Sequence, residues 1–537
     1  MSAASAASAF DADYLIVGGG SAGAVLASRL SEDPDCRVLL LEAGGRGDGW
    51  VTTTPFAGVL QVAAKVNNWS FETVPQAGLN GRRGYQPRGK ALGGSSAINA
   101  MVYTRGHRSD YDAWAAAGNA GWGYDDLLPF FVKAEGNERL GAPWHGQDGP
   151  LRVGDLRTDS PIHDAWRLAA RESGHAVVDD FNGADMEGLG VYQVTQHHGE
   201  RWSVARGYLA PHLGRRSNLR VETGVRALSL VLEGRRAIGV DVLQGGHRRT
   251  LRAAREVIVC AGALLSPQLL MLSGIGDGEQ LQAHGIAVRH HLPGVGRNLH
   301  DHPDFVFGYE SDSLDLAGIS ARGSARFVRE MRRYRRERRG LVTSNFAECG
   351  GFLSTRPGLP APNVQLHLVV ALVEDHARRL RLGHGLSCHV CLLRPRSRGA
   401  LTLANADPLA APRIDPAFLQ DPDDVRELIE GYKLTRDLMR TPAMKALWKQ
   451  ELWSASVDDD GGIEALLRQR VDTVYHPVGT CRMGHDAQAV VDDRLRVHGI
   501  EALRVVDASI MPSVVSGNTN APVVAIAEKA ATLIRLR

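Results

Sequence analysis

A glycine-rich turn between two apolar stretches near the N-terminus restricts the possible folds of this chain more than any other feature. Residues 12–33, ADYLIVGGGSAGAVLASRLSED, predict a buried strand, a turn and an amphipathic helix, and residues 36–45, CRVLLLEAGG, predict the next strand. Gly18, Gly20 and Gly23 form the pattern GxGxxG. In this pattern the first glycine makes the tight turn, the second lets a pyrophosphate approach the backbone, and the third packs the helix on the strand.

An acidic residue follows at the distance that this pattern requires. Glu42 ends the second predicted strand, nineteen residues after Gly23. A carboxylate in this position accepts hydrogen bonds from the hydroxyls of a ribose. Together the glycines and this acid predict an α/β domain that binds a dinucleotide. The pattern does not distinguish NAD from FAD, and a glycine turn without a ligand is the alternative.

Length and charge set further limits. A chain of 537 residues is too long for one ordinary core and predicts two or three domains, or one large cofactor-binding domain with an inserted partner. The formal net charge of +2 gives no reason to expect a nucleic acid as partner. No apolar run reaches the ~18 residues that a membrane-spanning helix needs. Residues 1–10 lack the basic and apolar regions of a signal peptide, and we expect a disordered tail there.

The six cysteines are scattered, several of them in apolar, strand-like runs. Cysteines in such places behave as small buried hydrophobic residues and stay reduced in a reducing compartment, so we expect a cytoplasmic protein. Cys388 and Cys391 form a CxxC pair in a stretch that predicts a strand, which would point the two side chains to opposite faces. A redox pair normally begins a helix, so we interpret this pair as structural.

Residues 326–340, RFVREMRRYRRERRG, contain eight arginines. Phe327, Met331 and Tyr334 have the spacing of one apolar helical stripe, which predicts a solvated helix lying over the body of the protein. The alternative is a face for peripheral docking on an acidic partner or an anionic membrane surface.

Four longer motifs carry a resemblance to a known family. They are GKALGGSSAINAMVYTRGHRSDYD (89–112), GALLSPQLLMLSGIG (262–276), VYHPVGTCRMG (474–484) and LRVVDASIMPSVVSGNTNAPVVAIAEKAA (503–531). In this order they resemble the signature patterns and the closing block of the glucose–methanol–choline (GMC) flavoprotein oxidoreductases. The resemblance extends from Asp11 to about Ile534. Within the family, the sequence is similar to the bacterial choline, alkanol, polyethylene-glycol and sorbose dehydrogenase branch.

The resemblance implies a fold and a division of the chain. We expect an α/β protein with a discontinuous, Rossmann-type FAD-binding domain and an α+β substrate domain built on an antiparallel sheet. The FAD-binding domain is predicted to contain residues 11–155, 200–307 and 465–537. The substrate-binding domain is predicted to contain residues 156–199 and 308–464.

The resemblance also implies which residues hold FAD. A loop of glycines and serines offers unhindered backbone N–H groups to a long cofactor, and the family places this loop against the pyrophosphate, the ribitol and the flavin. Ile98 aligns with the histidine that binds FAD covalently in some choline oxidases, so we expect non-covalent FAD. Arg82, Arg83 and Arg88 could support phosphates, with a surface loop as the alternative. The predicted cofactor-binding residues are Gly18, Gly20, Ser21, Ala22, Gly23, Glu42, Ala43, Arg88, Gly89, Gly93, Gly94, Ser95, Asn99, Met101, Val102, Val225, Ala261, Asp507, Ala508 and Thr519.

Two residues are the predicted catalytic pair. His476 precedes a proline, which favours an extended backbone, and a lone histidine is more often structural than catalytic. The resemblance reverses this expectation, since the corresponding histidine faces the flavin and acts as the base. Asn518 aligns with the second residue of the pair, where an amide donates a hydrogen bond to the substrate oxygen. The alternative for Asn518 is an ordinary helix cap.

The implied reaction is the oxidation of a primary alcohol to an aldehyde. His476 would take the hydroxyl proton while a hydride passes to flavin N5, and an acceptor other than NAD (a quinone, an artificial acceptor or oxygen) would take the electrons. An oxidase that produces hydrogen peroxide and a hydroxynitrile lyase with redox-silent FAD are the alternatives. The dense histidines of RHHLPGVGRNLHDHP (289–303) resemble a family segment without metal, so no metal site is expected.

Overall fold

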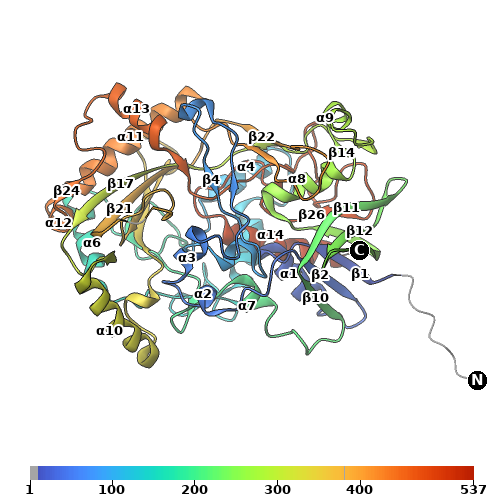
Figure 1. Ribbon diagram of the computed structural model, residues 1–537, viewed down its shortest axis with the longest axis horizontal. Helices are drawn as coiled ribbons and strands as arrows, with labels where there is room; N and C mark the ends of the chain where they lie inside the picture. Colours follow the sequence, from blue (N-terminus) through green and yellow to red (C-terminus); the bar gives the residue numbers. More distant parts are fainter. Residues whose placement is uncertain (1–9, 380, 537) are drawn as a thin grey trace, which may run out of the picture.

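The computed structural model describes residues 10–379 and 381–536. Residues 1–9 of the predicted disordered tail lie outside this range. Figure 1 shows two large sheets toward opposite ends of the long axis, with the C-terminal helix α14 (Asn520–Arg535) in the middle of the view.

The first sheet is mainly parallel and contains the predicted dinucleotide-binding unit. Its strands are, in order, β10 (Leu219–Thr223), β2 (Val38–Glu42), β1 (Ala12–Val17), β13 (His247–Val259), β12 (Arg236–Gln244) and β11 (Val225–Glu233), with β26 (Leu503–Val505) beside β13. Strands β10, β2, β1, β13 and β26 are parallel, whereas β12 and β11 continue β13 as an antiparallel meander. The apolar residues of β1 and β2 are buried on both faces, as expected for parallel strands covered by helices.

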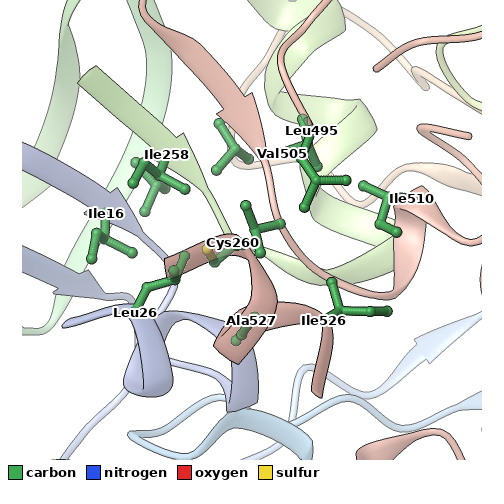
Figure 2. Packing of buried hydrophobic residues seen from close by; sticks show 14 of the residues in the cluster. Ile16, Leu26, Ile258, Cys260, Leu495, Val505, Ile510, Ile526 and Ala527 are labelled. Atoms are coloured by element: carbon green, nitrogen blue, oxygen red, sulfur yellow. The ribbon is translucent and has the colours of Figure 1, made fainter. Parts of the chain in front are cut away.

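Helices α1 (Ser21–Leu30) and α14 pack against this sheet and against each other. Figure 2 shows the shared core, in which Leu26 and Ile526 meet residues of three strands, Ile16, Ile258 and Val505. Helices α5 (Tyr124–Ala134) and α7 (Val204–Tyr208) complete this layer, and α8 (Gly262–Leu272) follows β13. The N-terminal ends of α1 and α14 meet, because Ser21 Oγ donates a 2.7 Å hydrogen bond to Asn520 Oδ1.

The second sheet is antiparallel. Its strands are, in order, β19 (Ala347–Leu353), β20 (Val364–Val369), β21 (Gly383–Leu392), β17 (Pro303–Ser311) and β24 (Gln450–Glu451), with β18 (Gly318–Ile319) beside β21 and β25 (Asp472–Thr473) beside β17. Helices α6 (Ile162–Glu172), α11 (Pro422–Met439), α12 (Pro442–Lys445) and α13 (Asp460–Arg470) join it in a separate core. Trp166, Phe305 and Tyr432 are among the fully buried side chains of this core.

The predicted fold class is confirmed, since a Rossmann-type parallel sheet stands beside an antiparallel sheet. The division into domains stays a prediction. Strand β17 crosses the boundary placed between residues 307 and 308, because all of it pairs within the second sheet.

Several local predictions are also confirmed. Cys388 and Cys391 lie in strand β21, and all six cysteines are free and buried. The arginine-rich segment forms helix α10 (Ala321–Glu337). Within residues 10–379 and 381–536, no helix combines the length and the apolar character needed to cross a bilayer. The cytoplasmic location stays a prediction.

A buried carboxylate ties the helices of the first layer together. Glu528 on α14 is fully buried and accepts hydrogen bonds from Arg29 Nη2 on α1 at 2.7 Å and from Tyr208 on α7 at 2.8 Å. Its second oxygen lies 2.9 Å from Lys133 Nζ on α5. One carboxylate therefore compensates charged and polar groups from three other helices.

We predict that Glu528→Ala lowers the free energy of unfolding by about 3–5 kcal/mol, because it leaves Arg29 and the Tyr208 hydroxyl buried without their partner. Glu32 pairs with Arg29 on the exposed side, and Glu32→Ala is expected to cost less than about 1 kcal/mol. Urea unfolding of both variants checks the difference. Equal losses would contradict the role of Glu528.

Candidate active site

A cavity of about 400 Å³ lies between the two sheets and is lined by residues from both. All the predicted cofactor-binding and catalytic residues line it except Gly23 and Gly93. Residues far apart in the sequence, such as Glu42, Val225 and Asn518, therefore belong to one cavity. The roles of the individual residues stay predictions.

The glycine turn has the geometry that its sequence predicts. Gly18 has φ +105°, and a Cβ there would lie 2.4 Å from the carbonyl oxygen of Cys260. A Cβ on Gly23 would lie 1.9 Å from the carbonyl oxygen of Gly18, so this glycine permits close packing of α1 on β1. A Cβ on Gly20 would meet nothing closer than 3.9 Å, and Gly20 lines the cavity. Gly20 therefore leaves space for a ligand, whereas Gly18 and Gly23 satisfy the packing of the protein itself.

Glu42 lies at the same end of the cavity. Its two oxygens accept hydrogen bonds from the backbone N–H groups of Gly19 at 3.0 Å and Gly44 at 2.7 Å. Burial nevertheless raises the pKa of Glu42 to about 7. Hydroxyl donors from a ribose would stabilise the ionised carboxylate further.

Two buried guanidinium groups also line the cavity, although the sequence indicated only Arg88. Burial lowers the pKa of Arg88 to about 10 and that of Arg201 to about 9. Arg201 donates to Asn99 Oδ1 at 2.8 Å and forms no ion pair with any residue that the structure describes. No pattern around Arg201 distinguishes it in the sequence. Arg82 and Arg83 do not line the cavity and donate to backbone carbonyls instead.

These features fit FAD. The open backbone at Gly20 and the joined N-terminal ends of α1 and α14 suit the anionic pyrophosphate. Two buried arginines add positive charge, and Glu42 can accept hydrogen bonds from a ribose. Asp507, whose pKa is raised by burial, accepts hydrogen bonds from Ser266 and from the N–H of Gly262 beside the same cavity.

The predicted catalytic residues meet at the other end of the cavity. His476 Nε2 lies 3.2 Å from Asn518 Nδ2. Asn518 Oδ1 accepts hydrogen bonds from Thr104 Oγ1 and from Gln365 Nε2, both at 3.1 Å. Because two donors hold this oxygen, the amide nitrogen must face His476.

The helix-cap alternative for Asn518 is wrong. The N-cap of α14 is Thr519, which makes no side-chain capping bond, and the side chain of Asn518 points away from the helix toward His476. Residues 518–520, at the N-terminal end of α14, line the cavity.

His302 is a residue of this site that the sequence did not indicate. Its Nδ1 lies 3.1 Å from His476 Nδ1, with the two rings at 87°. Burial lowers the pKa of His476 well below its usual value and that of His302 to about 4, so both rings are neutral near pH 7. Asn518 donates to His476 Nε2, which puts the His476 proton on Nδ1 and directs it to His302. The histidine pair therefore leaves Nε2 of His476 as the basic atom.

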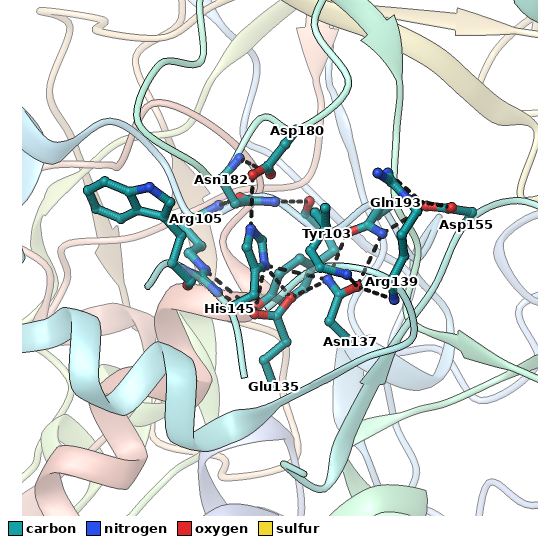
Figure 3. Close-up of polar contacts among 12 residues, drawn as sticks. Tyr103, Arg105, Glu135, Asn137, Arg139, His145, Asp155, Asp180, Asn182 and Gln193 are labelled. Carbon is teal, nitrogen blue, oxygen red and sulfur yellow. Dashed lines mark hydrogen bonds and ion pairs between the residues drawn. The ribbon is translucent and has the colours of Figure 1, made fainter. Parts of the chain in front are cut away.

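A polar network fixes the segment that carries Thr104 (Figure 3). Asn182 accepts from the N–H of Arg105 at 2.8 Å and donates to the carbonyl of Tyr103 at 3.2 Å. Arg105 forms a buried ion pair with Glu135, which also lies 3.0 Å from His145 Nδ1. Thr104 therefore has a fixed backbone from which to orient Asn518.

The wall opposite the cofactor end contains few charges. It includes His367, Val369 and His389 from the second sheet and Phe346, which precedes strand β19. Among the described residues, the only carboxylates that line the cavity are Glu42 and Asp507, both at the cofactor end. No group of three or more histidine, cysteine or acidic side chains within residues 10–379 and 381–536 is arranged to hold a metal ion.

A left-handed turn covers part of this end. Asp375, His376 and Ala377 have φ values of +48°, +56° and +61°, and the last two line the cavity. His376 lies 2.6 Å from the Tyr475 hydroxyl and 3.0 Å from Asp472 Oδ2. The turn is thereby attached to the segment that carries His476.

We predict that Gly20→Ala and Gly23→Ala fail in different ways. Gly20→Ala has space in the protein but occupies the ligand approach, so FAD affinity should fall about tenfold or more while the apoprotein keeps its stability. Gly23→Ala should lower the stability of the apoprotein by about 1–3 kcal/mol through overpacking. FAD titration and urea unfolding of the apoproteins separate the two effects. A large loss of apoprotein stability in Gly20→Ala would contradict the assignment.

Comparison with known proteins gives the family. Two GMC oxidoreductase models match residues 12–304 and 395–527. The chain is 45% identical to an alcohol dehydrogenase [acceptor] of Pseudomonas putida, over 97% of this chain and 95% of that protein. It is 42% identical to the mitochondrial choline dehydrogenase of Homo sapiens, over 97% and 89%. The crystal structure of pyridoxine 4-oxidase from Mesorbium loti superposes with a TM-score of 0.89 at 32% identity, over 98% of this chain and 100% of that one. The chain belongs to the GMC oxidoreductase family, with FAD as the cofactor that its cavity fits.

Proposed function

We propose that this protein is an FAD-dependent dehydrogenase that oxidises an uncharged primary alcohol to an aldehyde. The observation that carries the proposal is the basic Nε2 atom of His476, which faces the amide of Asn518 at the edge of the cavity. A histidine and an asparagine so arranged suit the removal of a hydroxyl proton.

His476 and Asn518 make different hydrogen bonds to the substrate hydroxyl. A hydroxyl group bound between them donates its proton to His476 Nε2 and accepts a hydrogen bond from Asn518 Nδ2. Asn518 cannot rotate away, because Thr104 and Gln365 hold its oxygen. FAD, when bound, accepts the hydride that leaves the carbinol carbon.

When His476 takes the proton, it becomes a buried cation, and its second ring nitrogen needs a hydrogen-bond acceptor. His302 Nδ1 accepts a hydrogen bond from His476 Nδ1, and this bond strengthens when His476 becomes an imidazolium. Asp301 accepts a 2.8 Å hydrogen bond from the backbone N–H of His476 and keeps the ring in position. His302 is therefore a positioning residue that sets the reactive nitrogen of His476.

The distribution of charged groups along the cavity favours a substrate without charge. A quaternary ammonium group is usually recognised by carboxylates or by an aromatic cage. Among the described residues, the carboxylates that line this cavity, Glu42 and Asp507, stand at the cofactor end. The catalytic end includes the neutral His367 and His476, the Asn518 amide and the rings of Phe346 and Tyr475. The lack of a lining carboxylate at the catalytic end, within the described residues, favours an uncharged alcohol over choline, despite the similarity to choline dehydrogenases as well as to an alcohol dehydrogenase [acceptor].

The electron acceptor is proposed to be a quinone or a related carrier. Oxygen as acceptor would produce hydrogen peroxide, and a hydroxynitrile lyase would leave the flavin oxidised in the presence of every alcohol. Both alternatives have direct assays.

We predict that an aliphatic or aromatic primary alcohol reduces the flavin of the purified holoenzyme without oxygen. Choline should react at least about a hundredfold less efficiently, because no carboxylate among the described residues lines the catalytic end to compensate its charge. His476→Ala should slow reduction by roughly 10²–10⁴-fold while FAD stays bound. Stopped-flow absorbance under nitrogen measures the rates, and a peroxide assay in air identifies an oxidase. A fully loaded flavin that no alcohol bleaches would refute the proposal in favour of the lyase.

We predict a second effect for His302. His302→Leu removes the acceptor for His476 Nδ1, so reduction should slow by about 10–100-fold, and the acid-side pKa of the kcat/KM profile should move to lower pH. His302→Asn offers an amide oxygen in the same direction and should restore most of the rate. A merely structural role would lower the rate in the leucine variant without moving the pKa. An unshifted profile would therefore contradict the positioning role.

A further inference from the structure

We infer that helix α10 and the adjacent loop form a surface that docks on an anionic lipid bilayer. The first observation is uncompensated charge. Arg322, Arg332, Arg335 and Arg336 are exposed and form no ion pair with any residue in the described part of the chain. Arg333 differs, since it pairs with Asp159 and Glu337.

The second observation is exposed apolar surface beside these arginines. Leu382 is 80% exposed, Val328 is 53% exposed and Ile319 is 44% exposed. Ile319 and Leu382 are neighbours across a β-bridge, and Ile319 comes directly before the N-cap of α10. Ile319 and Leu382 therefore lie together just before the N-terminal end of the helix, and Val328 is exposed near its middle.

The third observation is the position of these residues around the axis of the helix. Ala325, Val328, Arg332 and Arg335 follow one another at spacings of three and four residues, so they lie on one face. Leu314 adds to the same region, where it lines a hollow together with Arg322 and Arg329. Arginines together with exposed apolar side chains on the outer surface of a helix suit an anionic membrane surface.

The opposite face of α10 is anchored to the protein. Glu330 is buried and accepts a 3.1 Å hydrogen bond from the backbone N–H of Leu341, and Tyr334 is buried as well. The ring of Phe327 packs at a tilt against that of Phe56, with centroids 5.1 Å apart, and Phe56 packs in the same way against Phe346 of the cavity wall at 4.7 Å. Helix α10 lies at the edge of the molecule (Figure 1), and its Arg332, Arg335 and Arg336 are exposed.

The surface lies next to the cavity. The chain after β20 lines the cavity with Val373, His376 and Ala377 and then reaches the exposed Leu382. Phe327 is separated from the cavity wall only by Phe56. A bilayer on this surface would supply apolar alcohols and a lipid-dissolved acceptor close to the cavity. The docking itself does not depend on the proposed reaction.

A bilayer accounts for both kinds of exposed side chain. Phosphate headgroups compensate the arginines, and Leu382, Val328 and Ile319 enter the boundary between headgroups and acyl chains. An acidic protein would compensate the arginines and is the alternative that the experiment separates.

The test is sedimentation of the holoenzyme with vesicles of phosphatidylcholine alone or with one third phosphatidylglycerol. We expect binding to the anionic vesicles that weakens as salt is added. The triple variant Arg332→Glu, Arg335→Glu, Arg336→Glu should bind at least about tenfold more weakly. The variant Val328→Asp, Leu382→Asp should also lose binding, although it keeps every arginine.

Matched controls lie on other surfaces. Arg215→Glu, Arg248→Glu, Arg289→Glu changes the net charge equally, and Leu168→Asp changes a leucine that is 47% exposed on α6. Both controls should bind as the wild type does. Absence of wild-type binding to anionic vesicles at low salt would overturn the proposal and leave the surface to an acidic protein. Equal losses in the control variants would overturn it as well, because binding would then follow net charge alone.

Discussion

The orientation of the Asn518 amide is the interaction on which the rest of the site depends. Its oxygen is held by Thr104, from the loop after the glycine–serine segment, and by Gln365, from the antiparallel sheet. Its nitrogen is therefore fixed on His476. One amide thus joins three parts of the chain, and it determines which nitrogen of His476 carries a proton. His302 and the network around Asn182 and Arg105 extend this constraint in two directions.

The two ends of the cavity differ in the charge of the groups that line them. The cofactor end contains helix N-termini and two carboxylates, which suit a long, anionic, hydroxyl-bearing ligand, whereas Arg88 donates to the Tyr475 carbonyl beside His476. At the catalytic end, burial keeps the histidines neutral, as the lowered pKa values of His367 (about 3) and His302 (about 4) indicate. A neutral histidine is the form that can accept a proton, so burial itself prepares the base.

Much of the fold could be predicted because local patterns carry it. The GxGxxG turn, Glu42 and the apolar runs of β1 and β2 specify the parallel unit without any knowledge of the rest. The cavity-lining positions within the family motifs were expected from the resemblance rather than from local patterns, and their individual roles stay predictions. His302 and Arg201 were not predictable, since the importance of His302 arises from a neighbour at 3.1 Å. That of Arg201 arises from its burial without an ion pair to any described residue. The start of strand β17 could not be predicted from the sequence either, because pairing with β21, rather than a local signal, determines where that strand begins.

The left-handed turn at residues 375–377 has a consequence for access to the site. Left-handed geometry costs a non-glycine residue roughly 1–2 kcal/mol, so three such residues in succession are unfavourable on their own. The two side-chain contacts of His376 offset this cost, and one of them ends on Tyr475, the residue before His476. Breaking these contacts removes the compensation for the whole turn at once, so the segment opens cooperatively rather than residue by residue. The covering of the catalytic end and the backbone of the base are in this way parts of a single locally unfolding unit.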